Sequence, residues 1–207
     1  MKILNLYAGI SGNRKLWGDE HEITAIEYKP EIAKIYQDFF PKDKVIVADA
    51  HQYLRDHYKE FDFIWSSPPC PTHSKVRYAM AKSDNTEFQE KHNQNPVFPD
   101  MKLYQEILFL DGYFKGKWCV ENVVSWYDPL IRPAEIGGHY FWANFPIPDF
   151  ETGRSREHAS TIEIKQERKG FDLSEITGID KGLALKNCVE PELGEHILKH
   201  SIPLTLL

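Results

Sequence analysis

Residues 2–13 read KILNLYAGISGN, the first unit of a pattern that recurs along the chain. Lys2–Tyr7 is a short apolar run typical of a strand, and the small residues Ala8–Gly12 follow it as a turn. Glycine lets the main chain approach a ligand closely, and the helix expected after the turn would offer free N–H groups to an anion. A strand-to-helix turn without a ligand has the same pattern, so the stretch alone predicts only local structure.

The rest of the chain repeats this order of short apolar runs and helical stretches. Further strands are expected at 22–27, 44–48, 61–66, 118–123 and 140–143, and helices at Pro30–Phe40 and Asp100–Phe114. The alternating residues Thr161–Lys165 suggest one edge strand. We predict a single α/β domain over residues 1–207, with a mostly parallel, Rossmann-like sheet and helices on both faces.

Composition limits the class of protein. The chain has 25 Lys and Arg against 31 Asp and Glu, a net charge of −6, which argues against a general nucleic-acid binder. Its three scattered cysteines do not suggest a disulfide framework or a zinc site, and they fit a reducing cytoplasm. No apolar run reaches the roughly 18 residues of a membrane span, so we expect neither a span nor a signal peptide.

Acidic residues follow two of the predicted strands. Glu27 and Tyr28 end the second strand, and Asp49 follows the third. Ligands of open α/β sheets bind beyond the carboxyl ends of the strands, and an acid there often accepts hydrogen bonds from a ribose. These strand ends favour a nucleoside cofactor, although Glu27 alone would be read as a solvated acid.

A single cysteine follows the fourth strand, in SSPPCPTHS at residues 66–74. Two prolines fix the main chain before Cys70, which favours a positioned nucleophile over the small buried hydrophobe that an isolated cysteine usually is. Glu121 in the fifth strand would lie beside it if the strands are neighbours, while Cys119 is expected in the core.

These blocks, in this order and spacing, resemble the cytosine-5 DNA methyltransferases. The matching stretches are NLYAGISG at 5–12, Glu27-Tyr28, Asp49-Ala50, Pro-Pro-Cys at 68–70 and Glu-Asn-Val at 121–123. GHYFWAN at 138–144 and KNCVEPEL at 186–193 are similar to later motifs of the family. The resemblance implies the Rossmann-like fold of S-adenosylmethionine-dependent methyltransferases.

The resemblance also implies roles for individual residues. Cys70 would attack carbon 6 of a cytosine rotated out of DNA, Glu121 would bond nitrogen 3, and Asn122 would fix the loop. A thiolate is the reactive form, so Cys70 is expected at an electropositive, partly exposed position. S-adenosylmethionine, without a metal, would be bound by Tyr7, Ala8, Gly9, Ile10, Ser11, Gly12, Glu27, Tyr28, Asp49, Ala50, Pro68, Asn187 and Val189.

Several positions depart from the family pattern. Ser11 replaces a glycine where the main chain should pass the cofactor, and Pro71 replaces the usual Gln. Gly137 and His139 stand where relatives carry Arg-x-Arg, so His139, if protonated, would contact the oxygen 2 of cytosine. Arg132 or Arg154 could supply that contact instead.

The region that would recognise a target sequence is short. Residues 148–182 leave room for a reduced recognition region, and residues 183–207 would return to the cofactor pocket, which predicts a short or relaxed target in double-stranded DNA. The candidate DNA contacts are Ser74 and the basic residues Lys75, Arg77, Lys82, Lys91, Arg154, Arg156, Lys165, Arg168 and Lys169, and each basic residue could equally be a solvated charge.

The short recognition region suggests an enzyme of phage or bacterial origin, of the kind found in restriction-modification systems. Three alternatives stay open. The same chemistry could act on RNA, a modified sulfonium cofactor could be read by Ser11 and Arg14, or the chain could be a catalytically silent partner that binds DNA or another methyltransferase.

Overall fold

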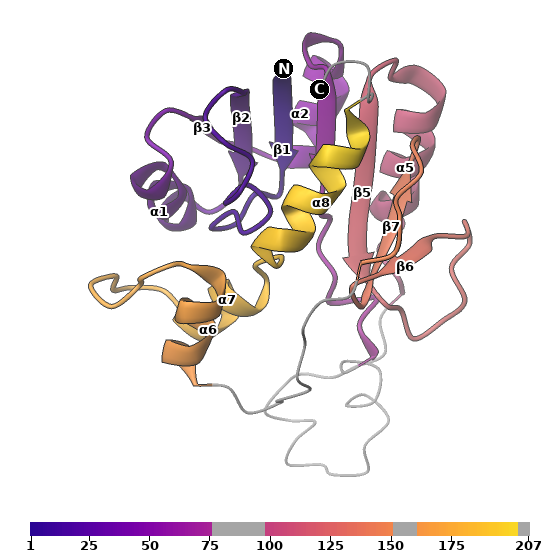
Figure 1. Ribbon diagram of the computed structural model, residues 1–207. Coiled ribbons are helices and arrows are strands. Elements are labelled where there is room, and N and C mark those ends of the chain that lie inside the picture. Colours follow the sequence, from indigo (N-terminus) through magenta and orange to yellow (C-terminus); the bar gives the residue numbers. More distant parts are fainter. Residues whose placement is uncertain (76–97, 151–160, 203–207) are drawn as a thin grey trace, which may run out of the picture.

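A seven-stranded sheet forms the centre of the molecule in the computed structural model, which describes residues 1–75, 98–150 and 161–202 (Figure 1). Its strands are β1 (Lys2–Leu6), β2 (Glu22–Glu27), β3 (Lys44–Val47), β4 (Phe63–Ser66), β5 (Lys117–Val123), β6 (Ala134–Ile136) and β7 (His139–Ala143). The strand order is β3-β2-β1-β4-β5-β7-β6. Strands β1 to β5 pair in parallel, and β7 is antiparallel to both β5 and β6. The predicted mostly parallel, Rossmann-like fold is confirmed.

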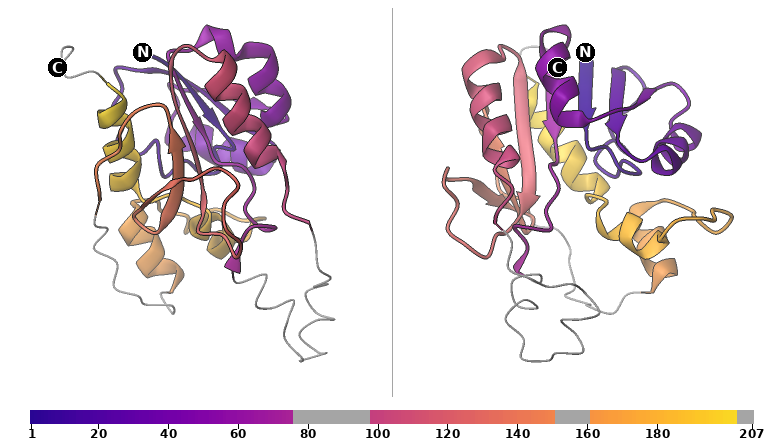
Figure 2. Two further views of the ribbon diagram at one scale, coloured as in Figure 1. Left: turned by 90° about the vertical axis from the view of Figure 1, so that its right-hand side faces the viewer. Right: turned by 180° about the vertical axis from the view of Figure 1, so that it is seen from behind.

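Helices cover both faces of this sheet. They are α1 (Pro30–Phe39), α2 (Ala50–His57), α5 (Lys102–Tyr113), α6 (Ile162–Lys169), α7 (Lys181–Lys186) and α8 (Pro191–Ser201), with a short 3-10 turn η1 at Tyr58–Glu60. The two opposite views show α2 and α5 on one face and α8 on the other (Figures 1 and 2). Ala25 and Ile23 are two residues apart in β2, so their side chains point to the same face of the sheet. Tyr36 of α1 packs with Ala25, and residues of α8 pack with Ile23. Helix α1 therefore lies on the same face as α8.

The helix expected after the first turn is absent, so that expectation is wrong. Residues 12–17 form only turns, and the C-terminal helix α8 packs on the sheet there with Ile3, Phe63 and Trp65. Trp17 Nε1 donates a 3.0 Å hydrogen bond to the carbonyl of Gly194 in α8. A helix from the far end of the sequence therefore covers the face beside the β1–β2 connection.

We expect Gly194→Ala to destabilise the fold. A Cβ at this helical position would overlap main-chain atoms of Asn13, which cannot swing away as a side-chain tip can. Overpacking of this kind costs roughly 1–3 kcal/mol of unfolding free energy, measurable by urea denaturation. Gly112→Ala in α5 is the control, because nothing lies within 4 Å of its Cβ. A loss in the control as large as at Gly194 would contradict this account.

Another difference lies in the region after β7. The expected edge strand Thr161–Lys165 belongs instead to helix α6, so that expectation is wrong. Thr161 Oγ1 accepts a hydrogen bond from Ile164 N, and Gly170 ends the helix with a φ of 66°. Capping residues at both ends stabilise this segment as a helix, and they outweigh the short alternation of apolar and polar residues that suggested a strand.

Candidate active site

The residues singled out in the sequence gather at one edge of the sheet. The turn Tyr7–Gly12 leaves β1, Glu27 ends β2, Asp49 follows β3, Cys70 follows β4, and Glu121 lies near the end of β5. The parallel strands bring their carboxyl ends to the same edge (Figure 1). This edge is where open α/β sheets bind ligands.

The turn after β1 is held open toward the edge. Gly9 has a φ of 55°, and a Cβ there would meet nothing within 4 Å. Glu27 Oε2 accepts a 2.9 Å hydrogen bond from Gly9 N, and its Oε1 accepts one of 2.9 Å from Lys29 N. A carboxylate offers about four lone-pair sites, so Glu27 retains acceptor capacity for the hydroxyls of a ligand.

The side chain of Ser11 turns away from this open space. It is 1% exposed, and its Oγ accepts a 3.0 Å hydrogen bond from Asn5 Nδ2, while Asn13 Nδ2 donates to Asn5 Oδ1 at 2.8 Å. The expectation that Ser11 adds a side chain where the main chain passes the cofactor is therefore wrong. Its hydroxyl belongs to a buried amide cluster behind the turn.

Arg14 is also turned inward. Its guanidinium is 3% exposed and pairs with Asp43, with Nε at 2.8 Å and Nη2 at 3.1 Å from the carboxylate oxygens. Nearby acids, Asp43 first among them, outweigh burial and raise the pKa of Arg14. A buried guanidinium whose Nε and Nη2 edge is already paired with Asp43 is not available to bind a carboxylated cofactor, which argues against that role for Arg14.

The C-terminal motif packs against the same turn. A Cβ at Gly12 would overlap the carbonyl of Val189 and the sulfur of Cys188. Val189 is buried, and Asn187 beside it is exposed. Residues 187–189 thus close one side of the turn, although they follow Gly12 by about 175 residues in the sequence.

The loop that carries Cys70 is tied to β5. Asn122 Nδ2 donates a 2.9 Å hydrogen bond to the carbonyl of Pro68, which is itself buried. The carbonyl of Cys70 accepts hydrogen bonds from His73 N at 2.9 Å and Ser74 N at 3.1 Å. These bonds fix the main chain on both sides of the cysteine while its side chain stays partly exposed.

The electrostatic environment of Cys70 differs from the expected one. Burial, and then the nearby carboxylate of Glu121, raise the pKa of the thiol, and the smaller effect of Lys186 opposes them. Among the described residues the main charged neighbour of Cys70 is an acid, so they do not form the expected electropositive position. A raised pKa favours the thiol form of Cys70 over the reactive thiolate.

We expect the alkylation rate of Cys70 by iodoacetamide to rise about tenfold per pH unit through neutrality, because the thiolate is the reactive form and its fraction grows in that way below the pKa. Since the pKa of Cys70 is raised, the alkylation rate should not level off below about pH 8.5, the usual pKa of a thiol. Mass spectrometry of the peptide separates Cys70 from the buried Cys119 and Cys188. A plateau below pH 7 would contradict this expectation.

Glu121 and His139 form a pair beside the cysteine. His139 Nδ1 lies 2.6 Å from Glu121 Oε1, across the antiparallel pairing of β5 with β7. Glu121 is only 8% exposed, and a buried carboxylate needs such a partner. His139 therefore contacts the carboxylate, and Arg132, the other described candidate for the missing arginine, is exposed.

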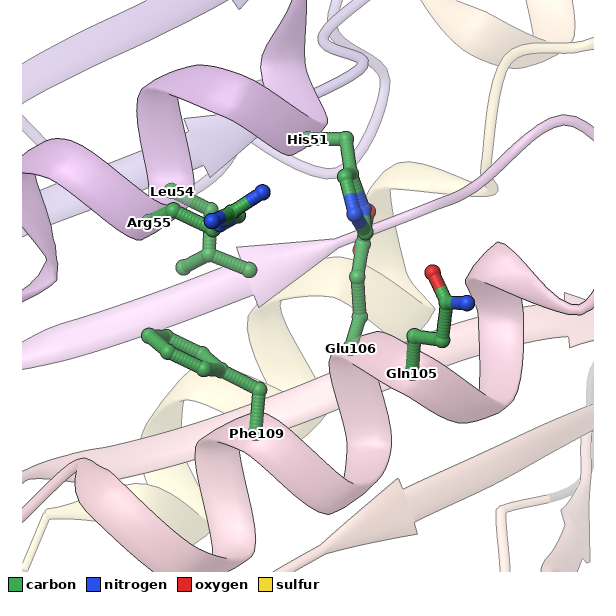
Figure 3. A pocket seen from close by; sticks show the side chains of 6 residues that line it. All are labelled: His51, Leu54, Arg55, Gln105, Glu106 and Phe109. Atoms are coloured by element: carbon green, nitrogen blue, oxygen red, sulfur yellow. The ribbon is translucent and has the colours of Figure 1, made fainter.

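A second buried carboxylate was missed in the sequence. Glu106 of α5 is 0% exposed and contacts Tyr7, Ser66 and His51. The signal was present, because Glu106 lies three residues after Leu103 and one before Ile107 on the apolar stripe of the helix. His51 and Glu106 point toward each other at a cavity of about 220 Å3 between α2 and α5 (Figure 3).

The candidate DNA contacts are only partly within the described structure. Arg77, Lys82, Lys91, Arg154 and Arg156 lie outside the described residues. Lys75 is exposed, Ser74 is half-buried and bridges to Ser125, and Lys165 is half-buried. Arg168 is exposed but paired with Glu190. Lys169 is 6% exposed and contacts Glu190 and the carbonyl of Cys188, which rules it out as a surface contact here.

Searches for metal sites and membrane spans concern the described residues alone. Among residues 1–75, 98–150 and 161–202, no group of three or more His, Cys, Asp or Glu side chains is placed to hold a metal ion. None of the helices in these segments is both long enough and apolar enough to cross a bilayer.

Several solved structures are similar to this chain. DNMT2 of Spodoptera frugiperda, solved as a triple mutant, is 26% identical over 59% of this chain and 35% of its own, with a TM-score of 0.37. A putative DNA modification methyltransferase encoded within an Escherichia coli prophage is 15% identical over 62% of this chain and 33% of its own, with a TM-score of 0.36. The putative methyltransferase yhhF from Escherichia coli is 14% identical over 69% of this chain and 73% of its own, with a TM-score of 0.41.

The alignments cover about a third of DNMT2 and of the prophage protein. No curated protein sequence matched the chain significantly. The model of the family "C-5 cytosine-specific DNA methylase" matches residues 1–94, which include the turn after β1, Glu27, Asp49 and Cys70. This match confirms the family resemblance predicted from the motifs up to Cys70, and the later motifs at 121–123, 138–144 and 186–193 lie outside it.

Proposed function

We propose that this protein transfers a methyl group from S-adenosylmethionine to carbon 5 of cytosine in DNA. One observation carries the proposal: β5, which bears Glu121, pairs with β4, and Asn122, next to Glu121, donates a hydrogen bond to Pro68 in the loop of Cys70. The family match over residues 1–94 supports methyl transfer as the reaction class.

The chemistry needs a nucleophile because cytosine is poorly nucleophilic at carbon 5. In the proposed reaction Cys70, once deprotonated, forms a bond from Sγ to carbon 6 of a flipped base, and the double-bond electrons move toward carbon 5. Carbon 5 would then accept the methyl group, whose bond to the sulfonium breaks so that S-adenosylhomocysteine is released, and would lose its proton to a base. The electrons of the broken C–H bond restore the double bond and expel the thiolate of Cys70.

Glu121 would act on the ring at nitrogen 3. A carboxyl group there can share a proton with the ring nitrogen as negative charge develops, which lowers the barrier to thiolate addition. We assign His139 to holding this carboxylate, since its Nδ1 faces Glu121 Oε1 at 2.6 Å. In this proposal the main role of His139 is to hold Glu121, rather than to contact the oxygen 2 of cytosine.

The residues at the strand ends fit S-adenosylmethionine, which supplies an electrophilic methyl group when bound. Glu27 has acceptor capacity for ribose hydroxyls, and Gly9 leaves the main chain open. Tyr28 is 74% exposed, so its ring is available for stacking on a base. Asp49 uses Oδ1 to cap α2 at Gln52 N, which leaves the other oxygen for an adenine amino group.

DNA would reach this edge near Ser74 and Lys75, with Arg77, Arg154 and Arg156 as further proposed contacts outside the described residues. Since the whole chain carries a charge of −6, its affinity for DNA should come from a local basic surface and fall steeply with salt. Residues 148–182 are proposed as a reduced recognition region and 183–207 as the segment that returns to the cofactor.

The test supplies labelled S-adenosylmethionine and equal amounts of cytosine-containing DNA and RNA duplexes of one sequence. Digestion and mass spectrometry then identify the modified base. The proposal expects 5-methylcytosine in DNA. Label in RNA alone would reassign the substrate, a heavier group on carbon 5 would reassign the donor, and no modification of either polymer would refute the proposal.

A further inference from the structure

Helix α5 places a buried carboxylate against three elements of the site. Glu106 is 0% exposed. Its Oε1 accepts from the Tyr7 hydroxyl at 2.5 Å and lies 2.9 Å from His51 Nδ1, and its Oε2 accepts from the Ser66 hydroxyl at 2.6 Å. Three of the roughly four lone-pair sites of this carboxylate are therefore engaged.

The three partners stand at different strand ends. Tyr7 is the first residue after β1, Ser66 is the last residue of β4, and His51 lies at the start of α2, just after Asp49. Glu106 therefore links the turn facing the proposed cofactor to the strand that leads into Pro68 and Cys70. A side chain that served packing alone would not need three donors from three elements.

The directions of these hydrogen bonds can be assigned. Burial and the adjacent Glu106 raise the pKa of Tyr7 above its ordinary value, so its hydroxyl keeps its proton and donates. Ser66 donates in the same way. His51 completes the arrangement with its proton on Nδ1, because that nitrogen faces an acceptor.

Tyr7 needs such a restraint because its main chain is strained. Its φ is 56°, in the left-handed region that residues other than glycine rarely adopt. Strain of this kind persists only where the surrounding contacts enforce it, and it is concentrated at functional sites. The ring of Tyr7 packs on the apolar cluster that includes residues of α5, and the hydrogen bond from its hydroxyl to Glu106 fixes it to that helix.

We propose that Glu106 is a positioning residue that holds the Tyr7–Gly12 turn in the shape that binds S-adenosylmethionine. This inference rests on the proposed function and adds a residue that touches the turn but not the cofactor. It assigns the hydroxyl of Tyr7 to holding the turn rather than to contact with the ligand.

The test removes one hydroxyl at a time and measures S-adenosylhomocysteine binding by calorimetry. Tyr7→Phe keeps the ring and loses the hydrogen bond, and we expect affinity to fall about tenfold, the scale of one charge-assisted hydrogen bond. The KM for S-adenosylmethionine should rise by the same factor, while kcat at saturation stays within about twofold, as for a loss of uniform binding. Glu106→Gln, which puts an amide donor among three donors, should weaken binding at least as much.

Tyr104→Phe is the matched control. Tyr104 is buried two residues before Glu106, and its hydroxyl contacts Tyr127 and Leu130 instead of the turn. The inference expects unchanged cofactor affinity in this variant. Equal losses in Tyr104→Phe and Tyr7→Phe, or wild-type affinity in Tyr7→Phe, would overturn it. If the wild-type protein itself bound no cofactor, the proposed function would fail first, which is a distinguishable result.

Discussion

Replacing Cys70 by alanine should abolish methyl transfer, with a loss on the order of 10⁴-fold or more, the scale seen when an enzyme loses its nucleophile. Cys70 supplies the covalent bond that makes carbon 5 reactive, and no other described cysteine is exposed at this edge. S-adenosylhomocysteine should still bind Cys70→Ala, since the turn after β1 is untouched. The measurement is the single-turnover rate of 5-methylcytosine formation.

The matched control is Cys119→Ala. This cysteine lies in β5 and is 0% exposed, so its thiol has no access to a substrate. The variant should lose stability through a small cavity but keep its rate once folded. If Cys70→Ala retained a rate within tenfold of wild type, the nucleophile would have to be another group.

The second large effect is expected at Glu121. Glu121→Gln keeps the shape of the side chain but replaces an acid with an amide, so the proton shared with nitrogen 3 of the base is lost. A positioned acid or base contributes roughly 10²–10⁴-fold to a rate, and we expect a fall of that size in the single-turnover rate. Cofactor affinity should not change.

Glu135→Gln provides the comparison, because Glu135 is an exposed acid on β6, at the far edge of the same sheet. It loses the same charge without touching Cys70 or His139. Equal rates for Glu121→Gln and Glu135→Gln would show that the carboxylate in β5 takes no part in the reaction.

Much of the fold could be predicted because its signals are local. Strand β2 at Glu22–Glu27 and helix α1 from Pro30 follow directly from a short apolar run and from a proline ahead of a helical stripe. The same holds for the order of Cys70 and Glu121 on neighbouring strands, since sequential strands with helical connections form a parallel sheet.

What the sequence did not reveal depends on contacts between distant residues. The connection from β1 to β2 lacks a helix because α8 fills that face, and nothing near Trp17 indicates a partner at Gly194. The raised pKa of Cys70 likewise follows from the approach of Glu121, about fifty residues later in the chain. The sequence shows Glu106 as an acid on the apolar stripe of a helix, but it does not indicate which residues Glu106 contacts.

The central claim is that Cys70 bonds covalently to a cytosine in DNA. The direct measurement uses a DNA duplex containing 5-fluorocytosine with S-adenosylmethionine, because fluorine at carbon 5 cannot leave as the proton does and the adduct cannot resolve. We predict a denaturation-resistant protein–DNA complex whose cross-linked peptide maps to Cys70, and no complex with Cys70→Ser. A complex that persists in Cys70→Ser, or one that maps to another residue, would contradict the account.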